Sequence, residues 1–256
     1  MSDSAAPQPA SFQADFRVGR VLSVSFSMLM KHLVQFFLIG VISAAPIVLW
    51  GIFLVSNANS LQSPEAAMAQ LSSIGVVMVA TLCIGAICQA VILYAAFQVM
   101  RGLPINLSEA IGVAIKRFIP LILVGICQWF ILVVWMVLLV IPGVIFATMI
   151  AVAVPVCVVE RLGPFASIGR STNLTKGHRW KILGLYLAYF VIVLLVSIVV
   201  GAVAGVIGIP WLAVLTDAVI RAFTSAWLSL ILVVTYHDLR AAKEGIGIDK
   251  IAAVFD

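Results

Sequence analysis

The amino-acid sequence predicts an all-α, polytopic integral membrane protein. Hydrophobic residues make up 64% of the 256 residues and charged residues only 10%, and the mean hydropathy is +1.23. Soluble domains are about half apolar and about a quarter charged. The apolar residues also gather in long runs, and the cations flank these runs. We therefore expect six transmembrane helices in three helix-hairpin units, each preceded by a cytosolic amphipathic helix.

The apolar runs define the predicted spans. A span must cross a hydrocarbon core of about 30 Å at a rise of about 1.5 Å per residue. The fourth run reaches only about 24 Å, so its helix is expected to be short or to begin inside the interface. The predicted spans are 33–55, 74–100, 118–141, 144–159, 182–209 and 211–236.

Prolines mark the turns and irregular points of these spans. Pro46 is expected to kink the first span, and Pro155 removes one backbone donor from the fourth. Pro142 and Gly143 are predicted to form the turn between the third and fourth spans. Pro210 is predicted to mark the turn between the fifth and sixth.

A short amphipathic segment is predicted before each pair of spans. The first covers Phe16 to Lys31, and its apolar face is expected to sink into the membrane interface. In the second, Asn106 is predicted to cap a helix with Glu109 three residues on, a variant of the capping box. The third begins near Phe165. This threefold repetition of pattern suggests an approximately threefold arrangement of the spans.

The cations predict the orientation of the chain. They occur in the N-terminal segment, the second and fourth connections and the tail, whereas the three opposite connections carry none. The positive-inside rule places both termini in the cytosol of a bacterial inner membrane. Residues 1–10 are polar and expected to be disordered, 11–240 form one membrane domain, and 241–256 form a short cytosolic tail.

The sequence carries no pattern typical of nucleic-acid binding, enzyme catalysis, metal binding or cofactor binding. The net charge of +5 is spread over flanks of apolar runs, so nucleic acid is not an expected partner. No catalytic constellation, metal site or cofactor motif is found, and we expect no enzyme activity. The cysteines are expected to be small buried hydrophobes and the histidines solvated interfacial residues: Cys83, Cys88, Cys127, Cys157, His32, His178 and His237.

The segment from Ile141 to Lys181 carries a family resemblance. Its motif begins with Ile141-Pro142-Gly143 and Pro155 and continues with Glu160, Gly163, Pro164, Arg170, Ser171, Leu174, Thr175, Gly177 and Trp180. It resembles the membrane domain of glycerophosphoryl diester phosphodiesterases and related small bacterial membrane proteins of unassigned role. In that family the membrane domain is sometimes fused to a hydrolytic barrel, for which this chain has no soluble stretch long enough. The resemblance therefore implies the membrane domain and not the hydrolysis.

The same segment holds the densest group of cations. Arginine forks match phosphate oxygens, and anionic headgroups lie at this depth. The alternative is that the cations only anchor the helices and set the topology. Glu160 is expected to pair with Arg170 or to cap the first turn, and Ser171 and Thr175 to serve as helix or turn hydroxyls. The candidate lipid-phosphate ligands are Arg161, Arg170, Lys176, Arg179 and Lys181.

Asp217 and Arg221 are the charges placed clearly within a span. An arginine near mid-depth costs about 2.5–3.5 kcal/mol on insertion scales, and the spacing of four puts both residues on one helix face. They form either a structural pair or part of a polar pathway. The leading function is thus a non-enzymatic scaffold or accessory factor that engages anionic lipid, a partner protein or a second copy. The alternative is a small transporter or channel that uses the Asp217 and Arg221 region.

Overall fold

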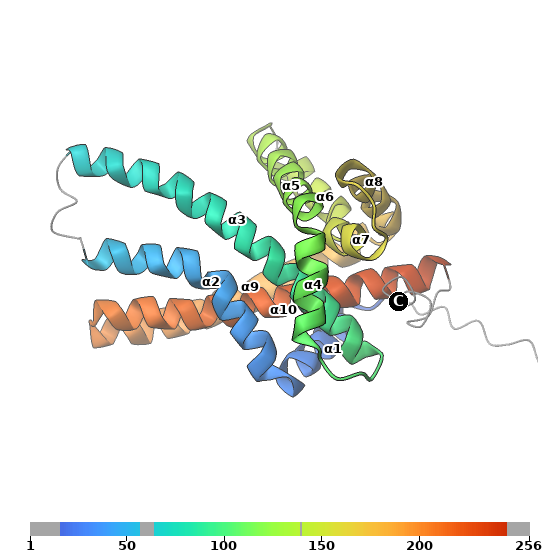
Figure 1. The fold of residues 1–256 in the computed structure, drawn as a ribbon, viewed down its shortest axis with the longest axis horizontal. Coiled ribbons are helices and arrows are strands. Elements are labelled where there is room, and N and C mark those ends of the chain that lie inside the picture. The colour runs from blue at the N-terminus through green and yellow to red at the C-terminus, as the bar shows by residue number, and fades with distance from the viewer. Residues whose placement is uncertain (1–15, 57–63, 139, 245–256) are drawn as a thin grey trace, which may run out of the picture.

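The computed structural model describes residues 16–56, 64–138 and 140–244, and every regular element in them is an α-helix (Figure 1). The all-helical class is confirmed. The disordered segment expected at 1–10 and most of the expected tail lie outside the described residues. The helices are α1 (Val18–Lys31), α2 (Leu33–Ser56), α3 (Pro64–Met100), α4 (Leu107–Lys116), α5 (Phe118–Leu138), α6 (Val140–Met149), α7 (Ala153–Val159), α8 (Pro164–Thr175), α9 (Arg179–Ile207) and α10 (Pro210–Glu244).

Six segments of the described chain are long and apolar enough to cross a membrane, which supports a multi-pass membrane protein. They correspond one to one with the predicted spans, although their ends differ by several residues. The segments are Leu33–Ser56, Ser73–Met100, Phe118–Trp135, Pro142–Val159, Arg179–Ile207 and Trp211–Glu244.

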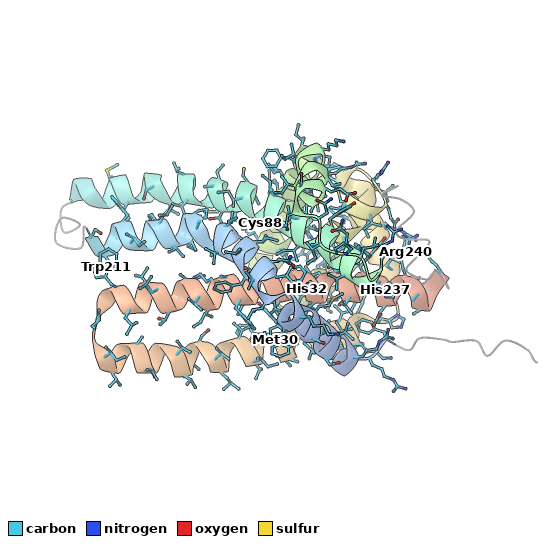
Figure 2. All side chains as sticks on the ribbon, turned by 60° about the horizontal axis from the view of Figure 1, so that its bottom comes forward. Met30, His32, Cys88, Trp211, His237 and Arg240 are labelled. Carbon is cyan, nitrogen blue, oxygen red and sulfur yellow. The ribbon has the colours of Figure 1, made fainter. Side chains whose placement is uncertain are left out.

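The helices form a compact head from which long pairs project. We call the head the part where α1, α4, α7 and α8 gather with the C-terminal ends of α3 and α10. Figure 1 shows the α2/α3 and α9/α10 pairs extending from it toward the same end, whereas α5 and α6 point in another direction. Figure 2 places Trp211 at the far end of the projecting pairs and Arg240 in the head. The three pairs are therefore not equivalent in direction, unlike the expected threefold arrangement.

The core lies in the head and not between the projecting helices. Three runs are buried almost without interruption, at 90–98 on α3, 150–159 around α7 and 233–239 on α10. A helix that is apolar around its whole circumference needs neighbours on every side. In contrast, α9 is exposed along most of its length, as expected for a helix that meets lipid.

α2 and α10 make the most extensive interhelical contact. Their backbones approach closely at Gly40, where an added Cβ atom would lie 2.1 Å from the carbonyl oxygen of Ala222. Glycine at this position lets the helices touch. Pro46 lies inside α2, and Figure 1 shows that this helix bends.

The connections around α5, α6 and α9 differ partly from expectation. α5 ends at Leu138 and α6 begins at Val140, so Pro142 and Gly143 lie in the first turn of α6 and the predicted turn there is wrong. Proline is favoured in the first turn of a helix, because the N–H groups of that turn have no intrahelical acceptor and proline has no N–H to leave unpaired. At the end of α9, Gly208 adopts the left-handed conformation with φ 70° and caps the helix.

The fourth span is broken into α6 and α7. The break covers Ile150 to Val152, where the Ala153 amide donates to the carbonyl of Ile150 at 3.1 Å. The sequence predicted a short fourth helix, and the structure shows two shorter ones instead. Pro155 follows the break in the first turn of α7.

Side chains from neighbouring helices satisfy the backbone at this break. The Ser171 hydroxyl donates to the carbonyl of Met149 at 2.8 Å and accepts from the Val152 amide at 3.3 Å. The Gln128 amide donates to the carbonyl of Ile150 at 2.8 Å. A broken helix at membrane depth requires such partners, because hydrocarbon supplies none.

The first amphipathic helix buries its apolar face in the protein. Val21, Met28 and Leu29 of α1 lie in the core, whereas Phe26 and Met30 stay about 40% exposed. The apolar stripe expected to enter the lipid is thus largely an interhelical contact, since α1 packs against α10 and α9.

The second short helix begins as predicted. The Asn106 side chain accepts from the Glu109 amide at 3.3 Å, which confirms the cap. The Glu109 carboxylate does not return to the Asn106 amide, which donates instead to Gln98 at 2.9 Å. Glu109 accepts from Tyr94 and Gln98, and so ties α4 to α3.

Candidate functional site

A network of alternating charges joins α7, α8 and α10 in the head. Glu160, which caps α7, accepts from the Arg170 Nε at 2.9 Å, so the predicted pair is confirmed. Arg170 also bonds Glu244 near the end of α10. Glu244 accepts from the Arg240 Nε at 2.9 Å, and Tyr236 bridges Arg240 and Glu160 at 3.0 and 3.1 Å. The network closes on itself.

The sequence places the α10 members of this network on one face. Tyr236, Arg240 and Glu244 are spaced by four residues, which brings helical side chains into one row. Pro164 begins α8 in its first turn after the loop from α7. That helix then presents Arg170 between the two carboxylates.

The charges of the network balance. Burial works against the charged form of Arg170, but its hydrogen bonds to Glu160 and Glu244 outweigh this and raise its pKa. Burial likewise works against the ionised Glu244, yet Arg240 and Arg170 hold the pKa of that carboxyl below its ordinary value. α10 is about 52 Å long, more than a hydrocarbon core of about 30 Å requires, and the apolar span predicted from the sequence ends at 236, before Arg240 and Glu244.

A second group of cations lies beside the network, and among the residues that the structure describes no acid pairs with it. We call Lys176, Arg179 and Lys243 the cationic corner. The pKa of Lys243 is lowered by burial and by the charges of Lys176, Arg170 and Arg179. The Lys243 ammonium donates to the carbonyl of Asn173, in the last turn of α8. Lysines there complement the negative end of the helix dipole.

One exposed aromatic side chain lies beside the cationic corner, and another lies at the opposite end of α8. Trp180, next to Arg179, is 79% exposed, and Phe165 at the start of α8 is 80% exposed. Tryptophan beside cations at a helix end is typical of a membrane interface. Gly177 precedes this end of α9 with φ 90°, a conformation that favours glycine.

The remaining motif residues organise the fold around the site. Leu174 is buried in the core. The Thr175 hydroxyl donates to the carbonyl of Met149 at 3.4 Å, beside the Ser171 contacts at the helix break. Ser171 thus binds a different helix, whereas Thr175 also donates to the carbonyl of Thr172 in its own helix at 3.3 Å and so serves as a helix hydroxyl, as predicted. Gly163 stands in extended conformation at the N-cap of α8.

The five candidate phosphate ligands do not act alike. Arg170 is bound by two carboxylates and belongs to the network. Lys176 and Arg179 belong to the cationic corner. Arg161, which has φ 55°, and Lys181 are exposed at the two ends of the α8 region.

Asp217 and Arg221 lie on α10, far from the network. The Arg221 Nε donates to Asp217 at 2.5 Å, and the side chains are 48% and 53% exposed respectively. Two apolar cavities in the described chain have volumes of about 640 and 380 Å³, and neither is lined by this pair. The geometry is that of a pair neutralised along one helix.

His237 departs from expectation. The residue is buried, with 8% of its surface exposed, and its Nδ1 lies 3.2 Å from the Asp238 carboxylate. Asp238 also forms an ion pair with Arg20 of α1 at 3.6 Å. His237 is thus a core residue and not a solvated one. Within the described ranges no group of three His, Cys, Asp or Glu could hold a metal ion.

The four cysteines are free thiols. Cys88 and Cys157 are buried as expected, whereas Cys83 and Cys127 are half-buried. They supply no disulfide to the fold.

Sequence reasoning missed the α10 half of the site. The predicted span 211–236 ends at Tyr236, and Arg240, Lys243 and Glu244 fall in the predicted cytosolic end and tail. Their spacing by four was the available signal, since it predicts that α10 continues with one polar face. The partner of that face, Arg170, lies 74 residues from Glu244 and could not be read from spacing.

The fold and site define a multi-pass helical membrane protein with a charge-balanced network at one end. In comparisons with protein-family models, with curated proteins and with solved structures, nothing matches this chain.

Proposed function

We propose that this chain is a non-enzymatic scaffold or accessory protein of the bacterial inner membrane that engages anionic lipid headgroups through the cationic corner. One observation carries the proposal. Lys176, Arg179 and Lys243 crowd together, whereas the nearby acids Glu160 and Glu244 are already bound by two arginines. The pKa of Lys243 is lowered first by burial and then by the charges of Lys176, Arg170 and Arg179, and an anion at the corner would offset those charges.

The exposed tryptophan beside the corner also supports this proposal. Trp180 is exposed beside Arg179, where phosphate groups of a bilayer would lie. The bias of cations in the sequence supports cytosolic termini. In this layout α2/α3, α5/α6 and α9/α10 are three hairpin units, and α1, α4 and α8 are the interfacial helices that precede them. An acidic partner protein or a second copy would be drawn to the same charges.

The resemblance to the membrane domain of glycerophosphoryl diester phosphodiesterases remains part of this proposal. The structure gives the motif residues physical roles, with Glu160 and Arg170 in the network and Ser171 and Thr175 at the helix break. None of these roles requires hydrolysis. The motif therefore supports a shared way of building the head.

The transport alternative would use Asp217 and Arg221. These side chains bind each other, and neither described cavity includes them. We therefore favour the structural pair.

Lipid titration tests the proposal directly. Purified protein in neutral detergent would be titrated with phosphatidylglycerol or with phosphatidylcholine, and bound lipid counted by native mass spectrometry. Each basic side chain near an anionic surface contributes about 1 kcal/mol. Replacing all three corner cations with glutamine is expected to weaken phosphatidylglycerol binding by about a hundredfold.

The control variant removes equal charge elsewhere. Arg17, Lys31 and Lys116 are exposed cations outside the corner, and their triple glutamine variant should keep most of the binding. Equal losses in both variants, or equal binding of the two lipids by the unchanged protein, would refute a localised headgroup site.

A further inference from the structure

A large apolar cleft separates α3 from α5. Its volume is about 640 Å³, within the range of roughly 300–1,000 Å³ that holds small molecules in proteins. Its walls come from α2, α3, α5 and α7, with Ile47, Val77, Ile126 and Val154 as examples from each helix. No charged residue lines it.

The cleft lies at membrane depth. Its walls belong to segments that are long and apolar enough to span a bilayer. Two polar side chains in the lining are already bound: Trp50 donates to Ser73 at 3.2 Å, and Gln128 donates to the carbonyl of Ile150 at 2.8 Å. These two bonds fix the walls.

Gln89 is different. It lines the cleft on α3 and is half-buried, and its amide makes no hydrogen bond within the described chain. An amide without a hydrogen-bond partner is unfavourable in an apolar medium. Gln89 lies about 18 Å along the helix from Arg101, too deep for lipid phosphate. Figure 2 shows its neighbour Cys88 midway along the molecule.

We propose that this cleft binds a neutral lipid whose hydroxyl or carbonyl oxygen hydrogen-bonds the Gln89 amide. The uncharged lining excludes an ionised headgroup, because an unpaired charge at this depth is costly. The apolar walls accept a hydrocarbon chain. The unpartnered Gln89 amide favours a molecule that carries a polar group within its apolar part. This site is separate from the cationic corner and does not depend on it.

Tryptophan quenching tests the proposal. Trp50 and Trp129 both line the cleft, so a bromine atom held there would quench their fluorescence. The protein in nanodiscs would be titrated with a brominated long-chain alkanol and with the matching brominated alkane. A hydrogen bond of ordinary net strength predicts about a fivefold preference for the alkanol. A Trp50→Phe, Trp129→Phe variant identifies the signal of the cleft.

Two variants distinguish binding in the cleft from hydrogen bonding to the Gln89 amide. Gly85 lines the cleft, and a Cβ added there meets nothing within 4 Å, so Gly85→Phe should fill the space and abolish saturable quenching by both probes. Gln89→Leu keeps the volume and should remove only the preference for the alkanol. Gly201→Phe on the exposed face of α9 is the matched control, since its added side chain also meets open space.

Three outcomes would overturn the proposal. Equal quenching by alkanol and alkane in the unchanged protein would show that Gln89 selects nothing. Unchanged quenching in Gly85→Phe would show that the probes bind elsewhere. A dimer that Gly85→Phe converts to a monomer, measured by native mass spectrometry, would show that a second copy covers the cleft.

Discussion

At the scale of single residues, small side chains and local charge pairs decide where the helices can meet. Gly40 and the Asp217–Arg221 pair are the clearest cases, because each owes its role to one neighbour. The first permits a backbone contact between α2 and α10. In the second, the Asp217 and Arg221 side chains neutralise each other on a helix surface at membrane depth.

Gly40→Ala should destabilise the protein. The new Cβ atom would lie 2.1 Å from the Ala222 carbonyl, so α2 and α10 must separate, at a cost of about 1–3 kcal/mol or more. Thermal unfolding in detergent measures this change. Gly201→Ala is the control and should be neutral or stabilising, since it has space and alanine favours helix. Equal melting temperatures for the two variants would argue against this helix contact.

Charge replacements at Asp217 and Arg221 should be strongly non-additive. Asp217→Asn leaves Arg221 unpaired at membrane depth, with a cost of roughly 2.5–3.5 kcal/mol. The Asp217→Asn, Arg221→Gln double variant should recover most of that stability because no charge remains. A double-mutant cycle measured by thermal unfolding tests this expectation. Additive effects would contradict the structural pair and favour separate roles for the two residues.

At the scale of elements, the break between α6 and α7 shows how one helix depends on another. The fourth span does not continue as a regular helix through Ile150 to Val152, and α8 and α5 supply the missing partners. Ser171 does so twice, as donor and as acceptor. α8 is therefore a support for the membrane segment as well as a carrier of Arg170.

Ser171→Ala should destabilise the head by about 1–3 kcal/mol, because it leaves the buried Val152 amide without its partner. Thr172→Ala is the matched control one residue on, since its hydroxyl binds only the Ile168 carbonyl of its own helix. Hydrogen exchange at residues 150–156 should rise in the first variant and not in the second. Unchanged exchange in Ser171→Ala would show that the break needs no side-chain support.

At the scale of the whole molecule, the charge network links segments that are distant in the sequence. It closes the end of α10 onto α7 and α8, and Arg20 of α1 reaches α10 at Asp238. The head is thus held by polar contacts around an apolar core. In the described residues the projecting pairs are joined by fewer polar contacts, of which the hydrogen bond from Trp50 to Ser73 is an example.

The network predicts a loss of stability in acid. The folded pKa of Glu244 lies below its ordinary value of 4.5, so its stabilising contribution is fully present above that pH and is lost as the pH falls through the folded pKa. Melting temperature against pH should therefore fall more steeply below pH 4.5 in the unchanged protein than in Glu244→Gln. Parallel curves would show that Glu244 contributes no such linkage.

Much of the fold follows from the sequence because hydropathy acts locally. The six apolar runs and the Asn106 cap were predictable from neighbouring residues. The network was not, because Arg170 and Glu244 meet only after the chain has folded. The burial of His237 was missed for a similar reason, since its depth depends on the helices around α10.

The central claim is that the cationic corner faces the cytosol, and site-directed labelling tests it most directly. Lys176→Cys and Ile209→Cys would be treated with a membrane-impermeant maleimide, in intact spheroplasts and in inverted membrane vesicles, with the unchanged protein as background. The account predicts that Lys176→Cys is labelled in inverted vesicles alone and Ile209→Cys in spheroplasts alone. Labelling of Lys176→Cys in intact spheroplasts would contradict it.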